Sequence, residues 1–258
     1  MASFTDPVVR PRMQGKARGI LRAGFPVTPL TSPVTVDGTA SVSTAGENPD
    51  RVLLVGNGPL SGWGVPSQEE AIPGHLAREL SYRTARAVEV DLVVDLAARI
   101  ETASTLVDDV DLHSFDAVVV VLGVSDALQL LPQSQWRDGL ASFAQTLLGG
   151  VSAAVDVVFV GIQSPSSVPF LGLPVGGRVD RAASDFNAVT RSLCGDRLRY
   201  LEPPALDRIG PARPDVPGAP APSDPREIAQ VSAGYNVWAV AIADTLARLR
   251  AQNVAWSR

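Results

Sequence analysis

Five short runs of apolar, mostly β-branched residues recur between residues 51 and 201, and longer amphipathic segments separate them. The runs are RVLLVG (51–56), VEVDLVV (88–94), DAVVVVLG (116–123), VDVVFVGI (155–162) and LRYL (198–201). Runs of this length and composition are typical of strands that are buried on both faces. Because strands and helical segments alternate, the pattern predicts a three-layer α/β/α sandwich with a mostly parallel, five-stranded sheet.

The segments between the strands have helical spacing. Helices are expected within residues 67–85, 102–110, 133–148, 181–194 and 232–252. In parallel sheets of this kind, ligands bind beyond the carboxyl ends of the strands. That rule selects the turn after Val55, the segment after Val94, the turn after Leu122 and the loop after Ile162.

The first 50 residues differ from the rest of the chain. They are rich in Gly, Pro, Ser and Thr and show no sustained period, so we expect an extended arm at 1–50 and one α/β domain at 51–258. Residues 1–22 hold five basic residues and one acidic residue, so the arm is basic and the remaining chain strongly acidic. The acidic domain argues against nucleic acid as the main partner. For the arm, packing on the domain or solvation is favoured over contact with nucleic acid or anionic lipid.

Composition indicates which cellular compartment, which cross-links and which cofactors to expect. No run approaches the roughly 18 apolar residues of a membrane helix, and no apolar signal segment is seen, so we expect a cytoplasmic protein without a membrane span. The single cysteine, Cys194, excludes an internal disulfide and agrees with a reducing compartment. With two histidines and one cysteine, neither a metal nor another cofactor is expected. The oligomeric state is not determined by these features.

Two loops after the predicted strands differ from ordinary connections. Residues 163–179 are apolar, with Phe170 near the middle, and residues 203–227 are so rich in proline that an extended conformation is expected. Both loops lie at the binding edge in the predicted topology. Each is open to two interpretations, a lid over an apolar ligand or a solvent-exposed insertion.

Several motifs at the strand ends carry a resemblance to a known family. VGNGPLSGWGV (55–65) resembles block I of the SGNH, or GDSL-like, hydrolases, in which Gly-Asp-Ser follows the first strand. LGVSD (122–126) resembles their Gly-x-Asn-Asp block, and VSAGYNVWAVAIADTL (231–246) resembles the helix after their Asp-x-x-His-Pro block. QEEAIPGHLAREL (68–80) is similar to their first helix. The resemblance spans residues 51–250 and implies a flavodoxin-like α/β/α fold and an esterase or lipase ancestry.

The family's catalytic groups are missing at the matching positions. The resemblance places the nucleophilic serine on Gly58 and the preceding aspartate on Asn57. It places the block II glycine near Ile100 and the block III asparagine, an oxyanion donor, on Ser125. A glycine has no oxygen that could attack an ester, so the nucleophile is absent.

The base is missing as well. Counting back from the last helix, the family's aspartate falls on Arg226 and its histidine on Ala229. The only histidines of the chain are His75 and His113, and neither lies in the C-terminal segment. By the family mechanism the resemblance therefore implies a degenerate member without catalytic residues.

A glycine-lined turn with free N–H groups can still hold an anion or a carbonyl group. The first hypothesis is therefore a non-hydrolytic pseudoenzyme that binds a small acyl-bearing or apolar ligand, or a partner protein, at the carboxyl edge of the sheet. The candidate binding residues are Gly58, Ser61, Trp63, Ser125, Asp126 and Phe170.

Two alternatives stay open. An esterase or acyltransferase could use a rebuilt serine site at Ser61 or Ser125, with a carboxylate base of raised pKa; the candidate bases are Asp126, Asp224 and Glu227. A weaker alternative interprets GNGPLSG (56–62) as the phosphate-binding turn of a dinucleotide-binding oxidoreductase, with Asp91 or Asp95 on the ribose.

Overall fold

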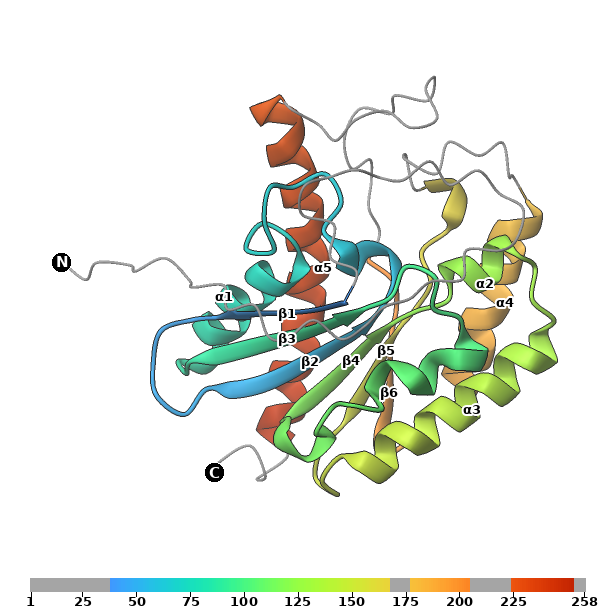
Figure 1. Cartoon of the computed structure of the whole chain (residues 1–258), viewed down its shortest axis with the longest axis horizontal. Helices are drawn as coiled ribbons and strands as arrows, with labels where there is room; N and C mark the ends of the chain where they lie inside the picture. The colour runs from blue at the N-terminus through green and yellow to red at the C-terminus, as the bar shows by residue number, and fades with distance from the viewer. Residues whose placement is uncertain (1–37, 168–176, 205–223, 253–258) are drawn as a thin grey trace.

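The sheet is organised around a central strand, β2 (Asp50–Gly56), which is buried along most of its length. The computed structural model describes residues 38–167, 177–204 and 224–252. Figure 1 shows the sheet in the centre of the molecule, with helices around it. The strands lie in the order β1-β3-β2-β4-β5-β6. Besides β2 they are β1 (Gly38–Ser43), β3 (Val88–Val94), β4 (Ala117–Val121), β5 (Val157–Val160) and β6 (Leu198–Leu201). All neighbours pair in parallel except β1 and β3, so the predicted α/β class is confirmed.

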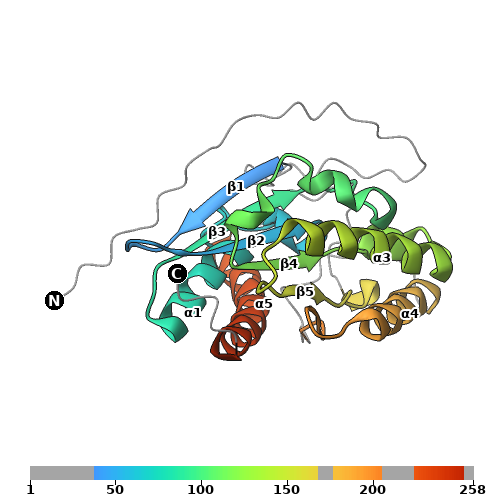
Figure 2. The same cartoon turned by 90° about the horizontal axis from the view of Figure 1, so that it is seen from below.

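Helices cover both faces of the sheet, and alternate residues of each strand feed two separate cores. Leu53 and Val55 of β2 pack with Phe143 and Phe186 in one core, and Val52 and Leu54 pack with Trp238 in the other. In Figure 2, α1 and α5 lie together on one side of the sheet and α3 on the other. The helices are α1 (Ile72–Thr84), α2 (Val124–Leu128), α3 (Gln133–Gly150), α4 (Arg178–Leu193) and α5 (Pro225–Gln252), with 3-10 turns η1 (Gly58–Ser61), η2 (Ile100–Val107), η3 (Leu112–Ser114) and η4 (Pro165–Ser167).

The sheet has one strand more than the five predicted. Strand β1 comes from the segment expected to be an extended arm, and it pairs antiparallel with β3, with Gly38 opposite Val94 and Ser43 opposite Glu89. Its sequence, GTASVS, has one large apolar side chain, Val42, which is also its one buried residue. Because most side chains of this edge strand are only partly covered, it needs no continuous apolar run, and this is why the composition did not reveal it.

Helix α5 also begins earlier than predicted. Residues 225–227 belong to the proline-rich segment expected to be extended, yet α5 starts at Pro225. Proline suits the first position of a helix because its fixed φ is helical and its missing N–H would have no partner there. The Asp224 carboxylate accepts the Arg226 N–H at 2.8 Å, which caps the helix. The two positions that the resemblance assigned to a catalytic loop, Arg226 and Ala229, therefore lie in the first turns of α5.

A buried carboxylate joins three elements at the amino end of the sheet. Asp50, at the start of β2, is 2% exposed and accepts a hydrogen bond from Arg86 Nε at 2.7 Å. It also pairs with Arg250 near the end of α5. A buried carboxylate is stable only when its charge is compensated in this way.

Replacing Asp50 by Ala leaves two guanidinium groups without their shared partner. We expect Asp50→Ala to lower the free energy of unfolding by about 3 kcal/mol, because breaking a buried ion pair costs more than it contributes when intact. Urea denaturation followed by tryptophan fluorescence measures the change. Asp138→Ala, on the exposed face of α3, is the matched control and should stay within about 0.5 kcal/mol of the wild type. Equal stabilities for the two variants would contradict this account.

Candidate functional site

The strand order creates a binding position between β2 and β4. From β2 the chain moves to β3 on one side, and from β3 it crosses back to β4 on the other side of β2. In open parallel sheets, ligands occupy the crevice at the carboxyl ends of two such strands, where the winding reverses. Gly58 lies in η1, which follows β2, and Ser125 lies in the first turn of α2, which follows β4. The structure therefore places both residues where the topology favours ligand binding.

The turn after β2 approaches β4 very closely. Gly56 has φ +144°, and a Cβ at this position would overlap the backbone carbonyl of Val121. The next residue, Asn57, donates its backbone N–H to the Val121 oxygen at 2.9 Å. Because no side chain could be accommodated at Gly56, this glycine is required by the contact between β2 and β4.

Asn57 connects the segments that follow β2, β3 and β4. Its side chain is buried, donates from Nδ2 to the Ala98 carbonyl at 3.0 Å, and lies 3.4 Å from Ser125 Oγ. An aspartate here could not donate to the Ala98 carbonyl, because an ionised carboxylate only accepts hydrogen bonds. The asparagine therefore acts as a structural bridge between the segments that follow β2, β3 and β4.

Gly58 begins η1 with φ +59°, in the left-handed region. A Cβ built here would lie 3.4 Å from Val124 Cγ1, which is ordinary van der Waals contact. There is thus room for a small side chain, but the backbone conformation is one that residues other than glycine rarely adopt.

Asp126 pairs with the backbone of Ile100 rather than facing the turn. Its side chain is fully buried, and both carboxylate oxygens accept the Ile100 N–H at 3.3 Å. Arg99 Nε lies 3.5 Å from Asp126 Oδ1. Burial raises the Asp126 pKa to about 6, partly offset by the Ile100 N–H and the positive charge of Arg99. The backbone donor at the block II position is therefore already occupied.

The remaining candidates are held by other elements. The Ser61 carbonyl accepts a hydrogen bond from Gln68 Nε2 at 3.2 Å, and Ser61 is buried. The Trp63 carbonyl accepts a hydrogen bond from the hydroxyl of Tyr235 on α5 at 2.8 Å. The structure thus joins Ser125 to Asn57 and Asp126 to Ile100, while Ser61 is held by Gln68 and Trp63 by Tyr235. Phe170 lies outside the described residues.

A serine–histidine pair exists, but between two helices. His75 Nε2 of α1 lies 2.9 Å from Ser232 Oγ of α5, and His75 Nδ1 lies 3.1 Å from Arg78 Nη2. Arginine has donors only, so Nδ1 must accept and Nε2 must carry the ring proton toward Ser232. Burial and the charge of Arg78 lower the His75 pKa to about 4, against the smaller effects of the Glu70 carbonyl and Glu79. A ring that donates to the serine cannot remove its proton.

The sequence did not reveal this pair, because 157 positions separate its members. The other histidine, His113, is exposed in η3 before β4, at the opposite end of the sheet from the candidate site. Asp224, considered above as a possible base, caps α5 instead.

The two aspartates of the dinucleotide alternative have other roles. Asp91 sits in the middle of β3, opposite Leu53 of β2, and pairs with Arg51 at 2.6 Å. Asp95 follows β3 and accepts the Ala97 N–H at 2.7 Å. Asp91 therefore lies away from the carboxyl edge at which a ribose would have to bind.

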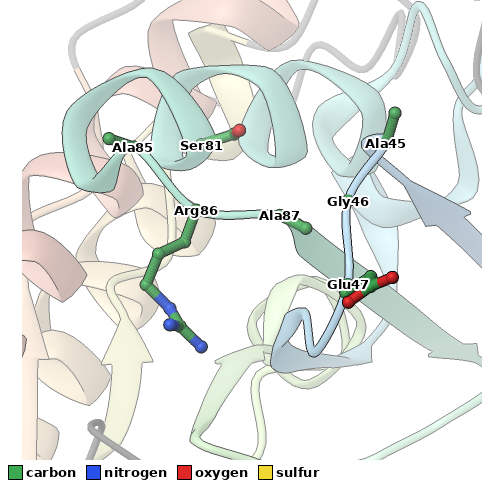
Figure 3. A pocket seen from close by; sticks show the side chains of 7 residues that line it. All are labelled: Ala45, Gly46, Glu47, Ser81, Ala85, Arg86 and Ala87. Carbon is green, nitrogen blue, oxygen red and sulfur yellow. The ribbon is translucent and has the colours of Figure 1, made fainter.

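A surface hollow of about 420 Å³ lies at the opposite end of the sheet (Figure 3). Figure 3 shows residues from the loop between β1 and β2 on one side and residues at the end of α1 on the other. Gly46 allows the two walls to approach, since a Cβ there would lie 2.7 Å from the Ala87 Cβ. The lining residues are Ala45, Gly46, Glu47, Ser81, Ala85, Arg86 and Ala87. None of them was a candidate from the sequence.

Within residues 38–167, 177–204 and 224–252, no helix is long and apolar enough to cross a membrane. In the same residues, no three His, Cys, Asp or Glu side chains gather in a way that could hold a metal ion.

No protein-family model matches the sequence, and a search of curated proteins gives no match either. Solved structures with some likeness include a lipase, Lip_vut3, from a goat rumen metagenome, with 12% identity, a TM-score of 0.49, and coverage of 58% of this chain and 79% of that one. TesA has 17% identity and a TM-score of 0.47, with coverage of 71% and 97%. The salicylyl-acyltransferase SsfX3 from a tetracycline biosynthetic pathway has 11% identity and a TM-score of 0.43, with coverage of 63% and 45%. Likenesses at this level assign neither a family nor an activity to the chain.

The raised pKa of the buried Asp126 carboxyl group predicts that the free energy of unfolding depends on pH. Its pKa is about 6 in the folded protein and 3.8 ordinarily, so between these values the folded protein binds a proton that the unfolded chain has lost. The resulting stabilisation is complete below pH 4 and is lost as the pH rises through 6.

Asp126→Asn removes this titration. Relative to the wild type, the variant should gain about 3 kcal/mol in free energy of unfolding between pH 4 and pH 7, from roughly two pKa units. Urea titrations of both proteins across this range measure the difference, in which the titration of all other groups cancels. A difference that stays constant with pH would show that Asp126 does not titrate there.

Proposed function

We propose that this chain is a degenerate SGNH-hydrolase-like pseudoenzyme, which binds a small acyl-bearing or apolar ligand at the carboxyl edge of β2 and β4 and does not hydrolyse it. The observation that carries the proposal is Gly58. It stands where the resemblance puts the nucleophile, at the position favoured by the strand order, in a left-handed conformation that suits glycine. No oxygen can attack from this residue.

The lack of a base supports the same conclusion. Ala229 lies in α5 and has no titratable group, and His75 directs its proton toward Ser232 instead of accepting one. In a serine hydrolase the histidine must be unprotonated on the nitrogen that faces the serine. In the one Ser–His contact within the described residues, the histidine thus donates to the serine instead of accepting its proton, and the contact is a hydrogen bond between α1 and α5.

The oxyanion donors are also engaged. The Ile100 N–H is bonded to Asp126, and the Asn57 amide donates to Ser125 Oγ and to the Ala98 carbonyl. Oxyanion stabilisation requires donors that are free and aimed at the reacting oxygen. A site in which these groups bond to one another can remain ordered without substrate, which suits a binding role better than an acyl-transfer role.

The rebuilt-serine alternative loses its nearest base. Asp126 is fully buried and bonded to Ile100, and within the described residues the hydrogen bond at the Ser125 hydroxyl comes from Asn57 instead. Ser61 is buried in the turn that Gln68 holds. A partner protein remains the second candidate occupant of the edge, but the exposed Leu96 and Leu130, which follow β3 and α2, favour an apolar or acyl group. The cytoplasmic location expected from the sequence is part of the proposal.

The proposal predicts that the wild-type protein neither turns over a short-chain nitrophenyl ester nor forms an adduct with a fluorophosphonate probe. Intact-mass spectrometry and a colorimetric assay check both expectations. Turnover that Ser61→Ala or Ser125→Ala abolishes would contradict the proposal and establish a rebuilt serine site.

Restoring the nucleophile alone should restore no activity. Gly58→Ser supplies the hydroxyl, but Ala229 supplies no base, so ester turnover should stay within twofold of the wild type. The same variant should lose about 1 kcal/mol of stability, because a serine at φ +59° adopts a strained backbone. Thermal denaturation confirms that the variant is folded. Measurable turnover in this single variant would contradict the account of the missing base.

A further inference from the structure

Arg99 lies at the candidate site, although the sequence patterns did not single it out. It follows β3, between Ala98, whose carbonyl accepts from Asn57, and Ile100, whose N–H donates to Asp126. Its side chain is 30% exposed, and its Nε lies 3.5 Å from the fully buried Asp126. Within the part of the chain that the structure describes, the side-chain hydrogen bond of Arg99 is the one from Nε to Asp126, and its terminal nitrogens make none. Arg99 therefore brings a partly exposed positive charge to the edge where the turns after β2 and β4 meet.

The guanidinium group can serve two anions. Its planar fork offers one pair of donors along the edge formed by Nε and one Nη, and a second pair from the two Nη atoms at its end, so a carboxylate bound at Nε leaves donors for another. Asp126 takes the Nε side and is itself held by the Ile100 N–H. The other nearby carboxylates are Asp95, which accepts the Ala97 N–H, and the exposed Glu101, whose charge is screened by solvent.

Exposed apolar side chains belong to the segments that follow β3 and α2, next to the residues that hold this charge. Among the described residues, four large hydrophobic side chains are exposed, and two of them belong to this edge: Leu96 at 39% and Leu130 at 40%. Leu96 follows β3 and Leu130 follows α2, so they come from the two segments adjoining the site. Val124 lies against the Gly58 turn. A cation and exposed apolar side chains on adjoining segments are complementary to a ligand with an acidic head and a hydrocarbon tail.

We infer that the ligand of this edge is an amphipathic carboxylate, a free acid with a hydrocarbon chain, whose carboxylate pairs with Arg99. The inference rests on the proposed function and deepens it by naming the ligand class. A neutral ester brings no charge to the terminal nitrogens of Arg99, whereas a carboxylate forms a charge-assisted, bidentate pair with them. The site therefore favours the free acid over its neutral counterpart of equal chain length.

Isothermal titration calorimetry with octanoate and octanol tests this inference, because the two differ only at the head group. The wild type should bind octanoate more tightly than octanol. Arg99→Met should weaken octanoate binding at least tenfold and leave octanol binding within twofold. Arg137→Met removes an exposed arginine from α3 and is the matched control, which should change neither affinity.

A second variant covers the case in which Arg99→Met fails to fold because Asp126 loses its neighbouring charge. Arg99→Lys keeps that charge but not the planar fork, and octanoate affinity should fall between those of the wild type and the Met variant. Circular dichroism and thermal denaturation establish that each protein is folded before titration.

The outcomes separate the inference from the proposed function. Equal affinity for octanoate and octanol, or octanoate binding that is unchanged in both Arg99 variants, overturns the carboxylate inference and leaves acyl binding in place. Absence of octanoate binding to the wild type also overturns it, without restoring any hydrolytic role. Ester turnover by the wild type would instead contradict the proposed function itself.

Discussion

The carboxyl ends of β2 and β4 approach so closely at Gly56 that a Cβ there would overlap the Val121 carbonyl. The arrangement of the site depends on this contact, because the Asn57 N–H then bonds to Val121 and directs the chain into η1. The turns after these two strands are brought side by side at the reversal of the winding, where α/β sheets bind ligands. The Asn57 side chain extends the connection to the segment after β3.

The polar groups of this edge are largely bonded to one another. Asn57 bonds to Ala98 and lies beside Ser125, while Asp126 accepts the Ile100 N–H. Buried polar groups that satisfy each other in this way stabilise and order a site. A catalytic site needs the reverse, with donors kept free for a charge that develops only in the transition state. This bonding pattern agrees with the binding role proposed above, in which Arg99 supplies donors to the ligand.

The packing of α1 against α5 supports the same edge from one face of the sheet. His75 bonds to Ser232, and Arg83 pairs with Asp244 at 2.8 Å, so the two helices are joined at two levels. Between them, Tyr235 reaches the Trp63 carbonyl and ties α5 to the turn after β2. His75, the histidine that contacts a serine, thus contributes to the packing of helices. The hydrogen bond from Arg78 to Nδ1 leaves the ring proton on Nε2, where it is donated to Ser232.

Local sequence alone determined the strands β2 to β6 and the helices α1, α3 and α4 between them, because buried parallel strands and amphipathic helices each leave a characteristic apolar pattern. The helix predicted at 102–110 is instead the 3-10 turn η2, and the short helix α2 was not predicted. The sequence also showed that Gly58 supplies no nucleophile, since that depends on residue type alone. Only the tertiary structure showed that β1 is an edge strand and that His75 donates to Ser232. It alone also showed that Asp126 is buried against Ile100, with Arg99 beside it. These features pair residues that are distant in the chain, and their energies depend on solvent exposure and on the orientation of donors, which no local pattern encodes.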